Sequence, residues 1–204
     1  MATTTTNFGW DIPQSTDLVK DGATAIAALG QDIDTAMNTA LGTKKAGMVL
    51  LNTTSFSAVA SQSINDVFSA TYNNYKILVS NITGSTALTL NLRLRVGGAD
   101  NSTASSYGYL GLYATTSILY SAGNGTSLPS IVNVGATHPA SSVMDVFNPF
   151  KTTRTSFHTI SRNDDSNYFN AGGVHTQTVS YTGFTLIAST GNMTGQVSVY
   201  GYNE

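Results

Sequence analysis

The 204-residue sequence contains no cysteine, which excludes disulfides and thiolate metal sites. Charge is also scarce, because Lys, Arg, Asp and Glu make up 10% of the residues instead of the usual quarter. A formal net charge of −2 provides no clustered positive field for nucleic acid or an anionic membrane surface. No apolar run approaches the ~20 residues of a membrane helix. We therefore expect neither nucleic-acid binding nor membrane insertion.

Motifs for catalysis or cofactor binding are lacking as well. No G-x-S-x-G sequence, P-loop or dinucleotide fingerprint occurs, so we predict no catalytic residue and no cofactor. The three histidines, His138, His158 and His175, are too far apart to form a short-spaced ligand pair, and no metal site is expected. Asp164 and Asp165 are the only acidic pair, and neighbouring strand residues point to opposite faces. They cannot easily flank one glycosidic bond, so a turn tip is expected there.

What the sequence does contain begins with a polar arm over residues 1-16, which carries the single tryptophan. Its start lacks the basic and apolar segments of a Sec signal. The candidate anchor residues in the arm are Phe8, Trp10, Ile12 and Pro13. An extended peptide with aromatic anchors can insert into a groove of a partner, so we predict that this arm docks to another protein. The alternative is a staple against the first helical turn, near Leu18.

A helical oligomerisation segment is predicted over residues 17-45, with the helix itself from about Asp17 to Leu41. Apolar and small residues alternate spacings of three and four, at Val19, Gly22, Ile26, Leu29, Ile33, Ala36 and Ala40. This spacing is typical of a heptad seam. The two interior glycines cost roughly 1 kcal/mol each, so the helix alone should be mostly unfolded. We predict self-association in a short coiled coil; the alternative is a lid folded back on the chain's own β-domain.

Residues 46-204 predict a head domain built from many short strands. Leu88–Val96 alternates apolar and polar residues, as a half-buried antiparallel strand does. Glycine-rich turn signals recur at Gly97-Gly98, Gly123–Gly125 and Gly172-Gly173, and a further strand is expected at Thr176–Tyr181. No helical period separates the strands. The predicted fold is mainly β, a jelly-roll-like antiparallel β-sandwich preceded by a single N-terminal α-helix.

Two groups of side chains in the predicted head could contact a receptor. Tyr107, Tyr109 and Tyr113 share one strand face by their even spacing, and aromatic faces of this kind bind sugars or line subunit interfaces and cores. Arg93 and Arg95 share a strand face as well and could clamp an anion; otherwise they belong to a solvated face. Both interpretations stay open for each group.

Two parts of the sequence resemble proteins of tailed bacteriophages. Asn7–Pro13 together with Asp17–Asp34 is similar to the N-terminus of tail-fibre and minor virion structural proteins, and Phe184–Ala188 with Gly195–Tyr202 resembles the closing strands of virion β-domains. The resemblance implies a virion-located fibre or spike subunit, usually homotrimeric, that is attached by its N-terminus to a tail or capsid protein. It also implies a head that binds the host surface, with a host-surface glycan as one candidate receptor.

Three alternatives to a tail fibre remain from the sequence. A head fibre or capsid decoration protein would have the same architecture on a different docking surface. A glycan-degrading depolymerase would need converging carboxylates, of which this acid-poor sequence has few. A free-standing lectin would leave the N-terminal arm without a purpose.

Overall fold

The computed structural model describes residues 3–6, 8–12, 18–41, 47–114, 118–135, 138–162 and 168–203. The chain divides into two compact units, Met1–Gly47 and Met48–Asn203. The first unit contains β1 (Thr3–Thr4), β2 (Asp11–Ile12) and α1 (Val19–Leu41). The strands from β3 onward, which build the head, are β3 (Gly47–Val59), β4 (Ser61–Ile64), β5 (Asn74–Gly84), β6 (Leu88–Val96), β7 (Ala99–Asp100), β8 (Tyr107–Ala114), β9 (Ile118–Gly125), β10 (Leu128–Val134), β11 (Ala140–Phe147), β12 (Thr155–Arg162), β13 (Tyr168–His175), β14 (Gly183–Ala188) and β15 (Met193–Asn203).

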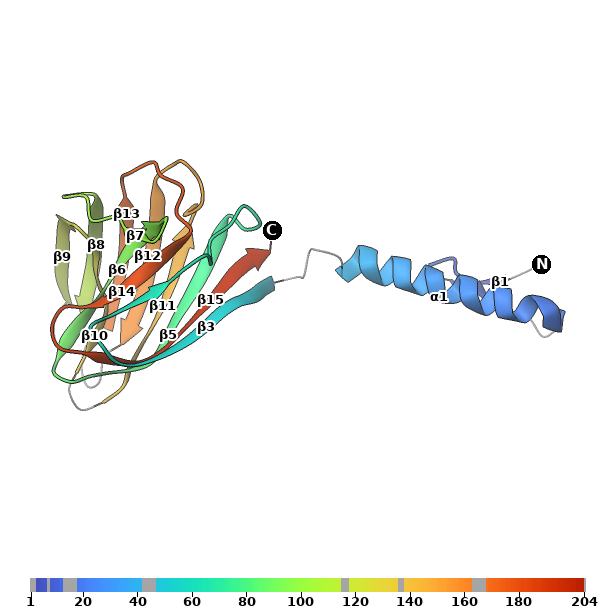
Figure 1. Cartoon of the computed structure of the whole chain (residues 1–204), viewed down its shortest axis with the longest axis horizontal. Coiled ribbons are helices and arrows are strands. Elements are labelled where there is room, and N and C mark those ends of the chain that lie inside the picture. Colours follow the sequence, from blue (N-terminus) through green and yellow to red (C-terminus); the bar gives the residue numbers. More distant parts are fainter. Residues whose placement is uncertain are drawn as a thin grey trace. The chain divides into compact units, whose positions relative to one another are not determined.

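The N-terminal unit consists of a short hairpin and the helix (Figure 1). β1 and β2 pair antiparallel, with Thr3 opposite Ile12 and Thr4 opposite Asp11. Gly9 has a positive φ of 68°, a conformation that glycine adopts without steric cost, and this lets the chain turn back. β2 lies against α1. The sequence analysis assumed an extended arm. The described residues of the arm instead fold into a hairpin.

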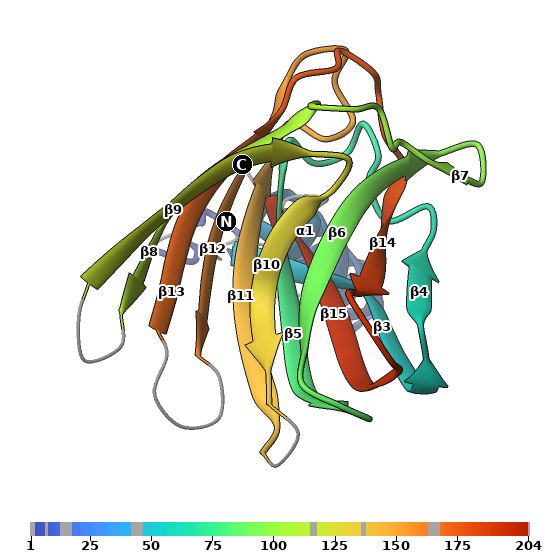
Figure 2. The ribbon, with the colours of Figure 1, turned by 90° about the vertical axis from the view of Figure 1, so that its left-hand side faces the viewer.

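The head has two antiparallel sheets that face each other across a shared core, as expected for a β-sandwich (Figure 2). The small sheet has the strand order β10-β6-β14-β4, with β7 paired to β6. The large sheet has the order β3-β15-β5-β11-β12-β13-β8-β9. The described part of the chain is thus mainly β with one helix, which confirms the predicted fold class at this level.

The core forms where the inner faces of the two sheets meet. Leu90, Leu92 and Leu94 of β6 are fully buried, and the residues between them point outward, so the predicted alternation of this strand is confirmed. Ile77 of β5 and Met144 of β11 are buried in the same cluster from the large sheet. Burial of such apolar side chains contributes roughly 1.5–3 kcal/mol each and holds the sheets together.

Two predicted turns are strand interiors in the structure. Gly172 and Gly173 lie within β13, and Gly123 lies within β9. A Cβ on Gly173 would come within 2.6 Å of the Leu128 side chain, and one on Gly123 within 3.0 Å of the Tyr109 ring. Glycine is therefore required there for close packing, not for a turn. The predicted strand at Thr176–Tyr181 is wrong, because β13 ends before it and the segment has no strand structure.

The turn between β6 and β7 has the predicted Gly97-Gly98 sequence and a positive φ at both residues, 59° and 80°. Two such residues are characteristic of the type I′ turns that join closely paired strands. The resulting register places Asp100 opposite Arg95. This turn thereby sets up a charged network on the small sheet.

Candidate interaction surfaces

The turn of the N-terminal hairpin displays the two aromatic side chains of the arm. Phe8 and Trp10 stack with their ring centroids 5.0 Å apart and an interplanar angle of 18°. The Thr5 N–H donates to the Trp10 carbonyl over 2.8 Å, and the Trp10 N–H donates to Thr5 Oγ1 over 3.0 Å. Phe8 is 68% exposed, Trp10 is half-buried and Ile12 is exposed, while Pro13 lies outside the described residues. The arm thus presents a preformed aromatic pair, whose docking remains a prediction.

The helix leaves much of its apolar surface in solvent. Of the predicted seam residues, Ile26 and Ala40 are exposed, Gly22, Leu29, Ile33 and Ala36 are half-buried, and the side chain of Val19 lies outside the described ones. Ile26 is 65% exposed, and Leu18, the suggested partner of an aromatic staple, is 62% exposed. Within the N-terminal unit, the described residues therefore leave this helix largely uncovered.

The tyrosine face of β8 points into the protein. Tyr107 is fully buried, Tyr109 and Tyr113 are half-buried, and Tyr113 packs edge-on against Phe169 with centroids 6.2 Å apart. Leu110 on the opposite face is 64% exposed. The sequence left open whether these tyrosines bind a ligand or line a core or an interface. Tyr107 belongs to the core, because its ring and hydroxyl contact other residues on the inner side of the large sheet.

A polar cluster surrounds Tyr107 inside the head. Its hydroxyl accepts a hydrogen bond from the Leu94 N–H and donates one to the Asn101 carbonyl, each over 2.9 Å. The fully buried His175 ring lies 4.2 Å from the Tyr107 ring, centroid to centroid. Burial raises the pKa of Tyr107, so the phenol stays neutral. The cluster ties the loop after β7 to both sheets.

His175 is held as a neutral imidazole. Asn101 Nδ2 donates to the Tyr181 hydroxyl over 2.8 Å, so that hydroxyl is free to donate to His175 Nε2, which lies 2.7 Å away. Burial lowers the pKa of His175 to about 4, because a buried cation would lose its hydration. Its spacing in the sequence gave no sign of this role. From the sequence alone, a histidine two residues beyond a glycine pair could equally be a surface residue or a buried one.

The two arginines of β6 engage separate partners. Arg93 donates from Nε to the Thr126 carbonyl over 3.0 Å and from Nη2 to Thr126 Oγ1 over 3.2 Å. Arg95 turns toward β14 and β4, where it contacts Ser63 and donates to Thr185 Oγ1 over 2.8 Å. They share a sheet face as predicted, but their guanidinium groups do not converge into one anion clamp.

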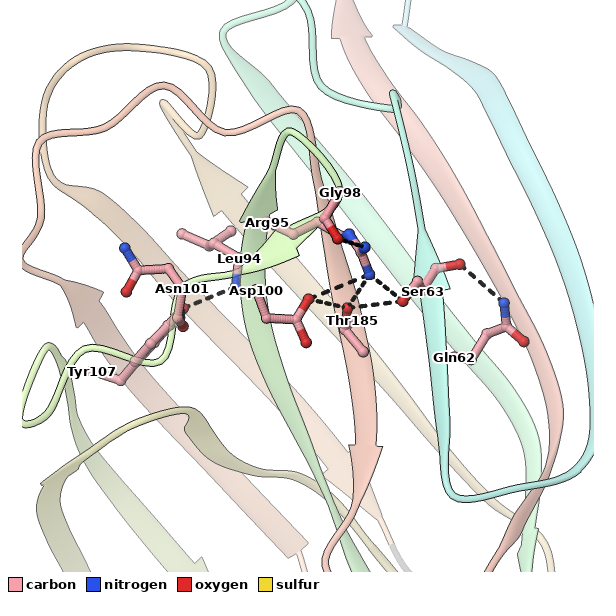
Figure 3. A network of polar contacts seen from close by, with 9 residues as sticks. All are labelled: Gln62, Ser63, Leu94, Arg95, Gly98, Asp100, Asn101, Tyr107 and Thr185. Atoms are coloured by element: carbon pink, nitrogen blue, oxygen red, sulfur yellow. Dashed lines mark hydrogen bonds and ion pairs between the residues drawn. The ribbon is translucent and has the colours of Figure 1, made fainter.

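The Arg95 network on the small sheet is closed by Asp100 (Figure 3). Arg95 Nη1 lies 3.3 Å from Asp100 Oδ1, and its Nη2 donates to the Gly98 carbonyl over 2.5 Å. Thr185 Oγ1 donates to Asp100 Oδ1 over 2.6 Å. The carboxylate and the hydroxyls thus compensate the arginine charge, and the network holds the β6–β7 turn against β14 and β4.

A second ion pair lies on the outer face of the large sheet and had no signal in the sequence. Lys76 Nζ and Asp145 Oδ1 are 2.7 Å apart across the paired strands β5 and β11, and the Tyr202 hydroxyl donates to Asp145 Oδ1 over 2.6 Å. Burial alone would raise the pKa of Asp145, but the hydrogen bonds from Lys76 and Tyr202 hold it below its usual value. The two charges neutralise each other.

The outer face of the large sheet is otherwise rich in apolar side chains. Strand register places Leu112, Asn170, Ile160 and Val143 in one row across β8, β13, β12 and β11. Apart from the amide, these side chains are exposed. We call the outer surface of these four strands the apolar face; Leu110 and Tyr168, both exposed, belong to it as well.

A hollow of about 600 Å³ opens beside this row, between β8 and β13. Its lining residues come from both faces of the sheet: Gly108, Tyr109, Leu110, Phe157, Gly172, Gly173 and Val174. A Cβ on Gly172 would meet nothing within 4 Å, so the hollow is open above this glycine. The apolar face therefore has a projecting leucine next to a recess.

The remaining candidates for chemistry do not gather into a site. His158 Nε2 lies 2.9 Å from Asn170 Oδ1 on the apolar face, whereas His175 is in the core. Asp164 and Asp165 lie outside the described residues. Within the described ranges, no group of three His, Cys, Asp or Glu residues could hold a metal ion. In the same ranges, no helix is long and apolar enough to cross a membrane.

Comparisons with known proteins identify no family for this chain. The sequence matches no protein-family model and shows no significant similarity to a curated protein. One solved structure that matches in shape is E230A-fructofuranosidase from Schwanniomyces occidentalis complexed with fructosylnystose. That match has 9% sequence identity and a TM-score of 0.23, and it covers 77% of this chain. The chain spans about a third, 34%, of the length of that enzyme. A similarity this low carries no argument about function.

Proposed function

We propose that this protein is a non-enzymatic structural protein of a bacteriophage virion. It forms a homotrimeric fibre or spike that docks through its N-terminal segment and displays β-heads for binding to the host surface. The observation that carries the proposal is α1, a 23-residue helix whose apolar residues remain uncovered within its own unit. Amphipathic helices of this length gain most of their stability from packing, so other copies are the natural partners.

The seam residues support a short coiled coil. Ile26 and Ile33 are seven residues apart and therefore recur at the same position of a heptad. Gly22, Ala36 and Ala40 are small enough to let neighbouring helices approach closely. Residues 42–46 alone separate the helix from β3, so self-association of the helix would also bring the heads together.

The strand order supports a jelly-roll head. In a jelly roll, one sheet has the order first-eighth-third-sixth and the other second-seventh-fourth-fifth. If β3, β4, β5, β6, β10, β11, β14 and β15 are numbered first to eighth, these orders become β3-β15-β5-β11 and β4-β14-β6-β10, and both occur as neighbours in the two sheets. β8–β9 and β12–β13 are then two hairpins added to the edge of the large sheet.

The N-terminal hairpin is the proposed docking element. Its stacked aromatic pair is exposed at the turn, and large aromatic side chains that fill a pocket contribute much of the energy of protein interfaces. A tail protein or a capsid protein would offer that pocket. A capsid decoration protein is the same proposal with a different docking partner.

Light scattering on the isolated full-length protein tests the trimer. We expect about three times the 21.4 kDa mass of the chain. Replacing Ile26 and Ile33 by Asp should dissociate the assembly, because unpaired charges would be buried in the seam. A wild-type monomer would refute the coiled coil, and a wild-type dimer would refute the trimer while keeping the seam.

Incubation with host surface polysaccharide separates the structural proposal from a depolymerase. We expect no release of reducing ends, because the acid-poor sequence provides no evident acid and base pair. Release of reducing ends that disappears in Asp164→Asn or Asp165→Asn would establish the enzymatic alternative instead.

A further inference from the structure

The two outward-facing sheet surfaces of the head differ in chemistry. On the small sheet, Arg93 and Arg95 are engaged by hydroxyl, carbonyl and carboxylate groups, and the surface is polar. The large sheet instead exposes the row of Leu112, Ile160 and Val143. Contiguous exposed apolar surface of this kind marks a contact with another molecule, because water alone covers it at a cost.

Charge and relief together describe the partner, and the one exposed cation among the described residues of the four strands is Arg162, at the end of β12. Lys76 and Asp145 neutralise each other at the side of the apolar face, so their pairing offers no net charge to a charged ligand. Leu110 projects beside the hollow above Gly172, which has room for an apolar side chain of another molecule. In a trimer each contact joins two different patches, so the projection of one head can fit the recess of the next around the three-fold axis.

The short connection to the helix makes a sister chain the available partner. Residues 42–46 lie between the end of α1 and the start of β3, and six Cα steps reach at most about 20 Å. If helices self-associate as proposed above, each head is confined close to its sisters at an effective concentration in the mM range. This step rests on the proposed trimer; the assignment of the contact surface does not follow from the helix.

We propose that sister heads pack through the apolar face, with Leu110 and Leu112 at the contact and the hollow at Gly108 and Gly172 receiving an apolar side chain of the neighbouring head. Gly172 lets the two surfaces approach closely, since the space where its side chain would be is open. The heads then contribute a contact of their own to the assembly, in addition to the contacts of the helical bundle.

Thiol labelling of the full-length protein tests this contact directly. Because the chain has no cysteine, Leu112→Cys introduces a single thiol on the apolar face, and Ser61→Cys introduces one at an exposed position of the small sheet as a control. Leu112 is 44% exposed on the head, so protection of its thiol requires cover from outside that head. We expect maleimide to react at least tenfold more slowly with Leu112→Cys than with Ser61→Cys, and to react quickly once Ile26→Asp and Ile33→Asp dissociate the protein.

The outcomes separate this inference from the proposed trimer. A trimer in which both thiols react equally fast refutes the head contact and leaves the coiled coil intact. A wild-type monomer with equal rates refutes both.

A second variant tests the hollow. Gly172→Val places a side chain where a Cβ meets no atom within 4 Å, so the single head should fold normally. Combined with Leu112→Cys in the full-length protein, it should restore fast labelling because the recess is filled. Ser61→Val, which adds a valine to an exposed strand of the small sheet, should leave labelling slow. Slow labelling of the thiol in the Gly172→Val trimer would show that the recess takes no part and would overturn the proposed packing.

Discussion

Acidification should destabilise the head through one residue, His175. The ring is fully buried, accepts a hydrogen bond from Tyr181 and has a pKa lowered to about 4 by burial, against about 6.5 in an unfolded chain. Between these two values the unfolded chain binds a proton that the folded head excludes. Stability is therefore complete above pH 6.5 and falls as the pH drops toward 4.

The size of the effect follows from the difference between the two pKa values. A difference of about 2.5 pH units corresponds to roughly 3 kcal/mol when both states have fully titrated. At pH 5 the loss should already be about 2 kcal/mol, a large part of the stability of a domain. Asp145, whose pKa is lowered, adds its own loss below its ordinary range, so the window from pH 7 to pH 5 isolates the histidine contribution.

Urea unfolding at fixed protein concentration, repeated at pH 7, 6 and 5, measures this contribution. The free energy of unfolding of the wild type should decrease with falling pH, whereas His175→Leu should start lower and depend much less on pH. His158→Gln is the matched control, because it removes a partly buried histidine of the outer face and keeps the buried one. A wild type that is equally stable at pH 7 and pH 5, or a His175→Leu protein with the wild-type pH dependence, would contradict the reasoning.

Three further outcomes are expected. Gly183→Ala should destabilise the head by about 2 kcal/mol or more in urea unfolding, because its Cβ would lie 2.2 Å from a backbone carbonyl oxygen of β4. Near-wild-type stability would mean that β14 and β4 can move apart without a loss of stability. Arg95→Met should cost about 2 kcal/mol, since it leaves the Asp100 carboxylate without its cation; a loss within about 0.5 kcal/mol would place the network among weak surface pairs. Removal of residues 1–13 should leave thermal unfolding of the head nearly unchanged while incorporation into particles is lost, and Trp10→Ala alone should weaken docking by about 2 kcal/mol; truncated chains on particles at normal occupancy would refute the anchor.

Local pattern was sufficient where the period of an element or its backbone requirement is written in consecutive residues. The alternation of Leu88–Val96 predicted β6 because a half-buried strand must repeat every second residue. The helix was predicted at nearly its observed bounds, Val19–Leu41, because its apolar spacing and its flanking residues agree. The Gly97-Gly98 turn was predictable for the same reason: its backbone requirement lies within the two glycines.

Features that depend on distant contacts were not predictable from the sequence. The glycines of β13 looked like a turn, yet Gly173 is small to accommodate Leu128, which is remote in the chain. The face of β8 that points inward was undetermined, since Tyr107 and Leu110 are both plausible core residues. The sequence contained one signal, a glycine at position 111 on the same face as Tyr107. The structure shows why it is there, because a Cβ on Gly111 would lie 2.7 Å from the Phe169 ring in the crowded interior.

The two inserted hairpins explain why this head has both a buried polar cluster and an uncovered apolar face. They widen the large sheet to eight strands, whereas the small sheet that faces it has five strands in the described part of the chain. On the inner side, β10 lies against β8 and β13, and large side chains such as Tyr107 and His175 are buried there, so their polar atoms need partners such as Asn101. On the outer side, no second layer covers Leu110 or Leu112 within the described residues of the head itself. The packing of sister heads proposed above would cover these strands, and it would link the width of the large sheet to the assembly of the protein.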